Sequence, residues 1–137
     1  NMRMGGLEAA SLSVKLKYLD GWNQRRQEIA KRYQSELHNT KIKLQLQPTW
    51  AQSVYHLFVV TTDDRNAFLK YLNEHNILAG LHYPVPCHLQ KAYTSLGYNE
   101  GDFPNAEYLA THCISLPMYA ELTSEELDYV IDVLNKY

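Results

Sequence analysis

Apolar residues at the start of the chain recur at helical spacing. From about Leu7 to Leu37 most of them step by three, four or seven positions, as on one face of an α-helix. A second apolar stripe widens this face and consists of Leu12, Leu16 and Leu19. The resulting face is wider than a helix that faces solvent needs. The pattern predicts one long helix over residues 7–37, with Gly21 as the position where it bends or admits a close neighbour.

The rest of the chain alternates short strand patterns with short helical patterns. The strongest strand pattern covers residues 53–61, and weaker ones lie near residues 42–46, 77–81 and 114–117. Helices are predicted after Asp63 or Asp64, over residues 89–96, from Pro104 to about residue 112, and after the capping-box-like segment Thr123–Glu126. This alternation predicts an α/β fold, in which helices cover one face of a small sheet and the long helix lies outside the compact part.

Composition narrows the class of protein. The 137 residues are 45% hydrophobic and 20% charged, which are values of a globular chain with one sizeable core. A net charge of −2 without a basic block disfavours nucleic acid as a partner. No apolar run reaches the roughly 20 residues that span a membrane and no signal peptide is visible, so we expect no membrane partner and a cytoplasmic location. The chain begins with Asn1 rather than methionine, which suggests a piece of a longer polypeptide.

One segment stands out chemically, from His82 to Tyr93. It contains two histidines, two tyrosines and two prolines, and each proline restricts its own backbone and that of the residue before it. A stiff polar and aromatic loop between regular elements is a common place for a binding site. His82 and Tyr83 are then donors to hydroxyls or phosphates of a ligand. Alternatively, they are a strand-end histidine with one backbone hydrogen bond and a packed tyrosine.

Other reactive side chains give weaker signals. Arg3 can grip an anion through two parallel hydrogen bonds and Asn1 can donate to one, although both are also ordinary solvated residues of a chain terminus. The spacing of His82 and His88 is not that of a zinc site, and no metal is expected. Cys87 lacks the orienting acid that a nucleophile needs, and two cysteines without a Cys-x-x-Cys spacing are expected as free thiols.

Six short motifs occur along the chain in a recognisable order. They are Asn1–Met4, Leu7–Ala10, Tyr55–Phe58, His82–Pro84, Gly101–Pro104 and Ser115–Met118. Each motif alone is weak, but the six in this order resemble the C-terminal part of the DegT/DnrJ/EryC1/StrS sugar aminotransferases. Gly5 and Gly6 depart from this resemblance, since many relatives carry an acidic or polar residue there. These relatives are fold-type-I enzymes that use pyridoxal phosphate (PLP).

The resemblance implies a fold and a division of the chain. It implies the small C-terminal domain of a fold-type-I PLP enzyme, with a small, mainly antiparallel sheet covered by helices and preceded by a long N-terminal helix. Residues 1–37 are then the helix that links to an N-terminal large domain, and residues 38–137 are the small α/β domain. The lysine that forms the aldimine with PLP belongs to the large domain, so no catalytic residue is expected in this chain, which alone is not expected to bind PLP.

The resemblance also implies roles for four residues. In that family the asparagine matching Asn1 contacts the cofactor phosphate in the site of the neighbouring subunit. The arginine matching Arg3, and the pair matching His82 and Tyr83, face the nucleotide-linked sugar across the interface of a homodimer.

The implied reaction transfers an amino group from glutamate to a keto group of a nucleotide-linked sugar. The sequence Pro84–His88 is more similar to relatives that act at C3 of the sugar than to those that act at C4. Two alternatives stay open: a non-catalytic interaction or dimerisation domain, and a PLP-family sugar dehydratase in which the lysine is replaced. The sequence does not specify the sugar, the ring carbon or the nucleotide.

Overall fold

A small antiparallel sheet lies at the centre of the fold. The computed structural model describes residues 3–137, and its strands are ordered β1-β2-β3. β2 (Phe58–Thr61) pairs antiparallel with β1 (Lys43–Leu44) and with β3 (Cys113–Leu116). The register places Val60 opposite Leu44 on one side and opposite Ile114 on the other. The predicted α/β class with a small, mainly antiparallel sheet is confirmed.

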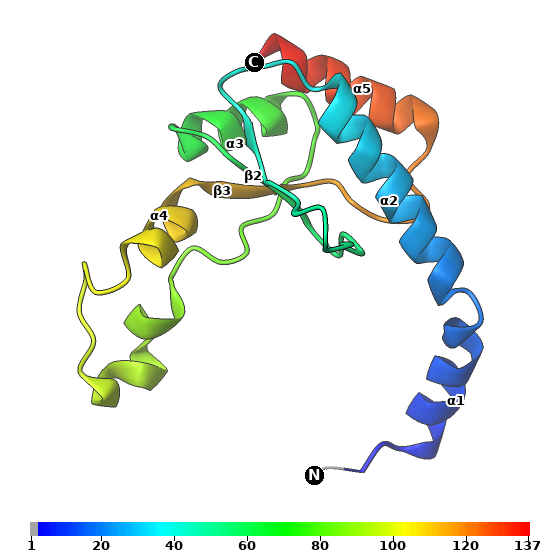
Figure 1. The fold of residues 1–137 in the computed structure, drawn as a ribbon, viewed down its shortest axis with the longest axis horizontal. Helices are drawn as coiled ribbons and strands as arrows, with labels where there is room; N and C mark the ends of the chain where they lie inside the picture. The colour runs from blue at the N-terminus through cyan, green and yellow to red at the C-terminus, as the bar shows by residue number, and fades with distance from the viewer. Residues whose placement is uncertain (1–2) are drawn as a thin grey trace.

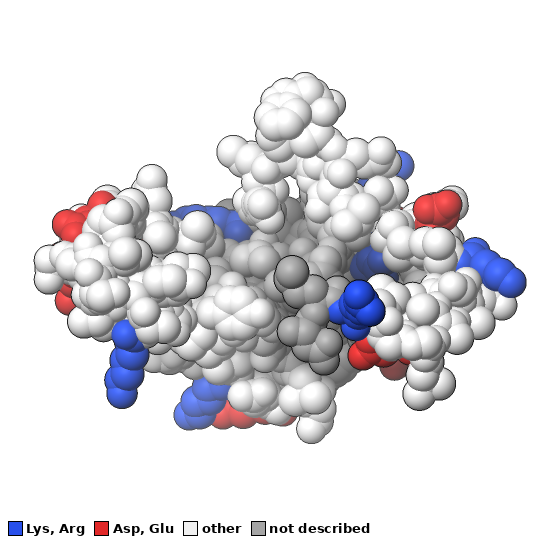
Figure 2. Space-filling view, turned by 90° about the horizontal axis from the view of Figure 1, so that it is seen from below, with Lys and Arg blue, Asp and Glu red and all other residues white. Residues whose placement is uncertain are grey.

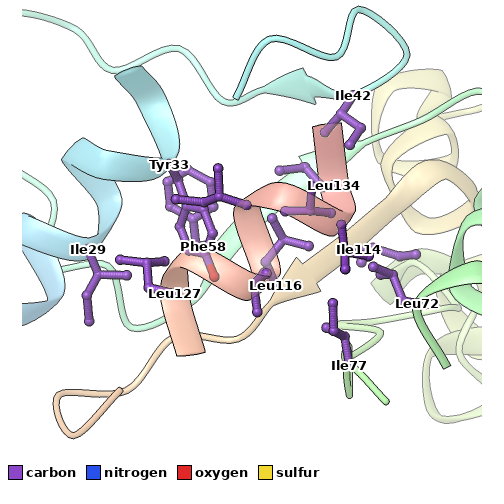
Figure 3. Packing of buried hydrophobic residues seen from close by; sticks show 14 of the residues in the cluster. Ile29, Tyr33, Ile42, Phe58, Leu72, Ile77, Ile114, Leu116, Leu127 and Leu134 are labelled. Atoms are coloured by element: carbon purple, nitrogen blue, oxygen red, sulfur yellow. The ribbon is translucent and has the colours of Figure 1, made fainter. Parts of the chain in front are cut away.

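Three helices cover the sheet on its core side. They are α2 (Leu19–Glu36), α3 (Arg65–Glu74) and α5 (Ser124–Lys136), which Figure 1 shows together above the strands. Their apolar faces meet the inward residues of β2 and β3 in one cluster, which Figure 3 shows from close by. The largest contributors include Ile29, Tyr33, Phe58, Leu72, Ile114, Leu127 and Leu134. This packing fixes where the ends of β3 and the following loops lie.

The starts of the helices follow the capping signals in the sequence. The carboxylate of Asp64 accepts a hydrogen bond from the amide of Ala67 at 2.9 Å and caps α3. The hydroxyl of Thr123 accepts from the amide of Glu126 at 3.2 Å, and the Glu126 carboxylate accepts from the Thr123 amide at 2.9 Å. These reciprocal bonds are a capping box at the start of α5. Pro104 is the first residue of α4 (Pro104–His112), as predicted.

The N-terminal helical region is divided into two helices. α1 (Gly6–Leu16) ends before Lys17, and the amide of Tyr18 donates to the carbonyl of Lys15, three residues back rather than four. Gly21, the predicted bend, lies inside α2. The prediction that the N-terminal helix lies outside the compact part is wrong for α2, because Ile29 and Tyr33 of α2 are buried in the core. One helix was predicted because the apolar stripe continues through the break, and periodicity does not register a single tightened turn. Gly5 and Gly6, which depart from the family pattern, lie at the start of α1, and the Glu8 carboxylate accepts a hydrogen bond from the Gly5 amide at 3.0 Å.

The predicted strands and one helix are shorter than the pattern suggested. In the segment 53–61 the strand begins only at Phe58, because Tyr55 has a φ of 47° and leaves the extended region. In the segment 77–81 only Gly80 pairs, through an isolated bridge to Ser115. The predicted helix over 89–96 consists of two short 3₁₀ helices, η1 (Cys87–Leu89) and η2 (Lys91–Leu96).

The described residues form an arch (Figure 1). The sheet and its helices form the top, α1 extends as one arm, and the segment 82–103 with α4 forms the other arm. Figure 2 looks onto the inner side of the arch, where uncharged residues dominate and most charged side chains lie at the periphery. No helix within residues 3–137 is both long enough and apolar enough to cross a membrane.

Candidate functional site

His82 is held at the base of its loop by strand β3. Side chains along a strand alternate between two faces, so Ile114 and Leu116 enter the core while Ser115 points to the opposite face. The Ser115 hydroxyl lies 2.9 Å from Nδ1 of His82. Gly80 and Ser115 exchange two backbone hydrogen bonds of 2.8 and 2.9 Å, which brings the start of the loop beside the strand. The fold therefore positions the His82 ring through a regular strand.

A cavity of about 570 Å³ opens beside His82, between the loop and α4. Its wall is mainly apolar and aromatic and includes Tyr83, Tyr93, Tyr98, Phe103 and Leu109. Tyr83 is 71% exposed, and the peptide bond that joins it to His82 is cis. An apolar cavity with a few polar groups at its edge is typical of a small-molecule site.

The far wall of the cavity is stabilised by Glu107 of α4. Its carboxylate accepts hydrogen bonds from the amide of Gly101 at 2.9 and 3.0 Å and from the amide of Phe103 at 3.3 Å. Nε2 of the buried His88 donates to the same carboxylate at 2.9 Å. The Gly101 amide, and then His88 and the Phe103 amide, hold the pKa of Glu107 below its ordinary value. Glu107 thus joins η1, the loop at residues 99–103 and α4.

The arrangement supports ligand binding more than covalent chemistry. The rings of His82 and Tyr83 meet edge to face with their centroids 5.5 Å apart, so an imidazole and a phenol lie together at the edge of the cavity. Both cysteines are free thiols, as predicted, and both line the cavity. Within residues 3–137 no three His, Cys, Asp or Glu side chains are grouped to hold a metal ion.

The N-terminal candidates lie apart from the loop. Arg3 is exposed and precedes α1, which forms one arm of the arch, whereas His82 and Tyr83 begin the segment 82–103 that runs into the other arm (Figure 1). Asn1 lies outside the described residues. Within this chain, Arg3 therefore does not share a site with the His82–Tyr83 pair.

Two positioning groups at the site were not predicted as such. Ser115 carried a signal, because it is a single hydroxyl between Ile114 and Leu116, and a buried hydroxyl needs a partner. Glu107 carried none, because most of its partners are backbone amides of a loop whose conformation the sequence pattern does not give.

Known proteins resemble this chain along its whole length. Residues 1–135 match the DegT/DnrJ/EryC1/StrS aminotransferase family. The chain is 42% identical over 135 residues to the erythromycin biosynthesis sensory transduction protein EryC1 of Saccharopolyspora erythraea, a match that covers 98% of this chain and 37% of that protein. It is also 42% identical over 137 residues to the dTDP-3-amino-3,6-dideoxy-alpha-D-galactopyranose transaminase of Aneurinibacillus thermoaerophilus, covering 100% of this chain and 37% of that protein.

A solved structure shares the fold. The crystal structure of DesV from S. venezuelae, in complex with a ketimine intermediate, superposes with a TM-score of 0.93 at 36% identity, over 98% of this chain and 36% of that one. The chain therefore spans little more than a third of the length of these relatives.

Proposed function

Because the chain belongs to the DegT/DnrJ/EryC1/StrS aminotransferase family, we propose that it is the substrate-binding part of a longer PLP-dependent aminotransferase. The full-length enzyme transfers an amino group from glutamate to a keto group of a nucleotide-linked sugar and acts as a homodimer. Residues 1–37 link to the preceding large domain and, through α2, also pack on the core of the small domain, which residues 38–137 form. A cytoplasmic location stays a prediction.

The relatives support the class of substrate and the position of the reaction. One of them is named as a transaminase of a dTDP-linked 3-amino-3,6-dideoxy sugar, and another as a transaminase of a dTDP-linked 3-amino-3,4,6-trideoxy sugar. Both names place the nitrogen at C3. This agrees with the similarity of the Pro84–His88 sequence to enzymes that act at C3, and we extend the proposal to amination at that carbon.

PLP, when bound, serves as the electron sink of such a transfer. A lysine that holds PLP covalently needs a buried environment that lowers its pKa, yet every lysine of this chain is exposed. The described residues therefore do not fit the covalent part of a PLP site. In our proposal the chain contributes Asn1 as a contact to the cofactor phosphate of the partner subunit, and no step of the chemistry is assigned to it.

The chain's own contribution is to hold and orient the sugar. His82 and Tyr83 form hydrogen bonds to the sugar at the edge of the cavity, and Arg3 binds an anionic group of the nucleotide from the other subunit. The observation that carries this assignment is the placement of both His82 and Tyr83 at the edge of an apolar cavity, with the His82 ring fixed by Ser115. The separation of Arg3 from this pair within one chain agrees with a site shared between two subunits.

Stopped-flow measurement of the two half-reactions of the full-length enzyme tests this proposal. We expect His82→Ala and Tyr83→Phe to lower kcat/KM for the keto-sugar and to leave the glutamate half-reaction nearly unchanged. A lost hydrogen bond to a neutral group costs about 0.5–1.5 kcal/mol, and one to a charged group about 1.5–3 kcal/mol, which together correspond to roughly 2- to 150-fold. Arg3→Ala is expected at the upper end because its partner is an anion.

Tyr93→Phe is the matched control, since Tyr93 lines the same cavity from η2 and keeps its ring in the variant. If His82→Ala slows both half-reactions equally, the residue acts on the cofactor or on folding, and the proposed substrate role is wrong. A full-length enzyme that shows no glutamate-dependent turnover would instead favour the dehydratase or the interaction domain.

A further inference from the structure

We propose that Ser115 is a positioning residue that fixes His82 in one tautomer, with the ring hydrogen on Nε2. The Ser115 hydroxyl donates to Nδ1, so the ring presents Nε2–H as a hydrogen-bond donor to the cavity. The inference depends on the proposed function only for the identity of the acceptor that Nε2 meets. The tautomer itself follows from the hydrogen bonding of the strand and the loop.

The environment of the Ser115 hydroxyl decides which atom is the donor. Ser115 is only 5% exposed, and Nδ1 of His82 is the only hydrogen-bond partner of its Oγ among residues 3–137. A buried hydroxyl hydrogen needs an acceptor. If His82 carried its hydrogen on Nδ1, both hydrogens would compete for the same contact and the Ser115 hydrogen would have no acceptor. The structure therefore favours a hydroxyl that donates to an unprotonated Nδ1.

Gly80 leaves the space that the His82 ring occupies when it contacts the Ser115 hydroxyl. A Cβ atom at position 80 would lie 2.4 Å from Cε1 of His82, closer than packed atoms approach, and 3.1 Å from Nδ1. The ring thus occupies space that only glycine leaves open. Two backbone hydrogen bonds join Gly80 to Ser115. Gly80, on which the ring packs, and Ser115, which donates to it, therefore belong to one rigid unit.

The chemical consequence concerns the opposite edge of the ring. Nε2 of His82 has no hydrogen-bond partner within the described residues, and His82 lines the cavity. A neutral ring with its hydrogen on Nε2 donates there and cannot accept. The site therefore selects a ligand atom that is an acceptor, such as a carbonyl or phosphate oxygen, or a hydroxyl that accepts.

Nitrogen NMR of the histidine rings tests the tautomer directly. In the 137-residue chain with ¹⁵N-labelled histidine, at mildly alkaline pH where histidines are neutral, we expect His82 to show a protonated Nε2 and an unprotonated Nδ1. His82→Gln assigns the resonances. His75 is the internal control of opposite sign, because its Nδ1 lies 2.8 Å from the carbonyl of Tyr71 and must donate. A wild-type His82 with its hydrogen on Nδ1 overturns the inference.

Two variants test the cause of the tautomer. Ser115→Ala removes the donor, and we expect the His82 signals to shift toward a mixture of both tautomers while those of His75 stay unchanged. Gly80→Ala displaces the ring and should give the same loss of preference with the hydroxyl intact. If Ser115→Ala folds and its His82 keeps the pure Nε2–H form, Ser115 is not the positioning residue. If it does not fold, the wild-type spectrum and Gly80→Ala decide.

Half-reaction kinetics of the full-length enzyme separate this inference from the proposed function. We expect Ser115→Ala to lower kcat/KM for the keto-sugar by about 2- to 13-fold, as for one neutral hydrogen bond, without slowing the glutamate half-reaction. An unchanged sugar half-reaction, together with the expected NMR result, would leave the tautomer established and would reject the role of His82 in sugar binding.

Discussion

Tyr33 links helix α2 to the chain beyond the sheet through a single buried hydroxyl. The side chain is fully buried, packs on Phe58 with ring centroids 4.8 Å apart, and donates a hydrogen bond to the carbonyl of Pro117 at 3.0 Å. Burial raises the pKa of Tyr33, so the hydroxyl keeps its hydrogen and remains a donor across the physiological range. The apolar contact and the hydrogen bond of Tyr33 therefore act together.

Tyr33→Phe is expected to lower the free energy of unfolding by about 0.5–1.5 kcal/mol, because it keeps the ring but removes the donor to Pro117. Urea denaturation followed by circular dichroism measures this change. Tyr129→Phe is the matched control, since its hydroxyl donates to the carbonyl of His75 at the same distance of 3.0 Å but the side chain is half-exposed. Water can replace that bond, so we expect almost no change, and equal losses in both variants would contradict the argument.

The carboxylate of Glu107 organises the loop that forms the far wall of the cavity. The carboxylate oxygens of Glu107 accept hydrogen bonds from the backbone amides of Gly101 and Phe103 and from His88, and these bonds favour the ionised carboxylate. The folded-state pKa of Glu107 is lowered from 4.5, so its contribution is present above that value and is lost as the pH falls through the folded pKa. The loop at residues 99–103 should therefore loosen in acid before the core unfolds.

Amide hydrogen exchange measured from pH 7 down to about pH 3 tests this expectation. We expect the amides of Gly101 and Phe103 to lose protection below the ordinary pKa of glutamate, while core amides of β2 stay protected. Glu107→Gln should show weak protection of both amides already at pH 7, because a neutral amide is a poorer acceptor. Glu125→Gln, an exposed change in the first turn of α5, is the control and should leave both amides unaffected. Protection that does not vary with pH would rule out this role.

Local signals in the sequence predicted the elements that have local causes. Caps at Asp64 and Thr123 and the proline at 104 located three helix starts, because each acts through bonds within one turn. The break at Lys17 was not predictable, because a single tightened turn leaves the apolar periodicity uninterrupted. The lone bridge at Gly80 was not predictable either, because it depends on a strand residue 35 positions away along the chain. For the site, His82 and Tyr83 were singled out by composition, whereas the support of His82 by Ser115 requires a contact 33 residues away along the chain.

Within residues 3–137, no residue of α1 is buried by another part of the molecule. Leu7 and Leu16 are 87% and 69% exposed. The apolar residues of α1 continue onto the start of α2, where Leu19 and Trp22 join the same groove. Figure 2 shows few charged side chains on the inner side of the arch. An exposed apolar surface of this extent is typical of an interface.

We therefore expect the 137-residue chain to associate in solution, as dimers or larger species by light scattering at ~100 μM, because burial of the α1 face removes apolar area from water. Leu7→Gln combined with Leu16→Gln should shift the distribution toward monomer. Leu46→Gln is the matched control, since Leu46 is 93% exposed but belongs to the segment between β1 and β2 rather than to α1. A clean monomer in the wild type, or the same shift from Leu46→Gln, would mean that α1 does not drive association. If association depends on α1 alone, the contact between chains lies on the arm that α1 forms, and Arg3 precedes α1 on that arm. The proposed shared site requires this same arm to meet a second subunit.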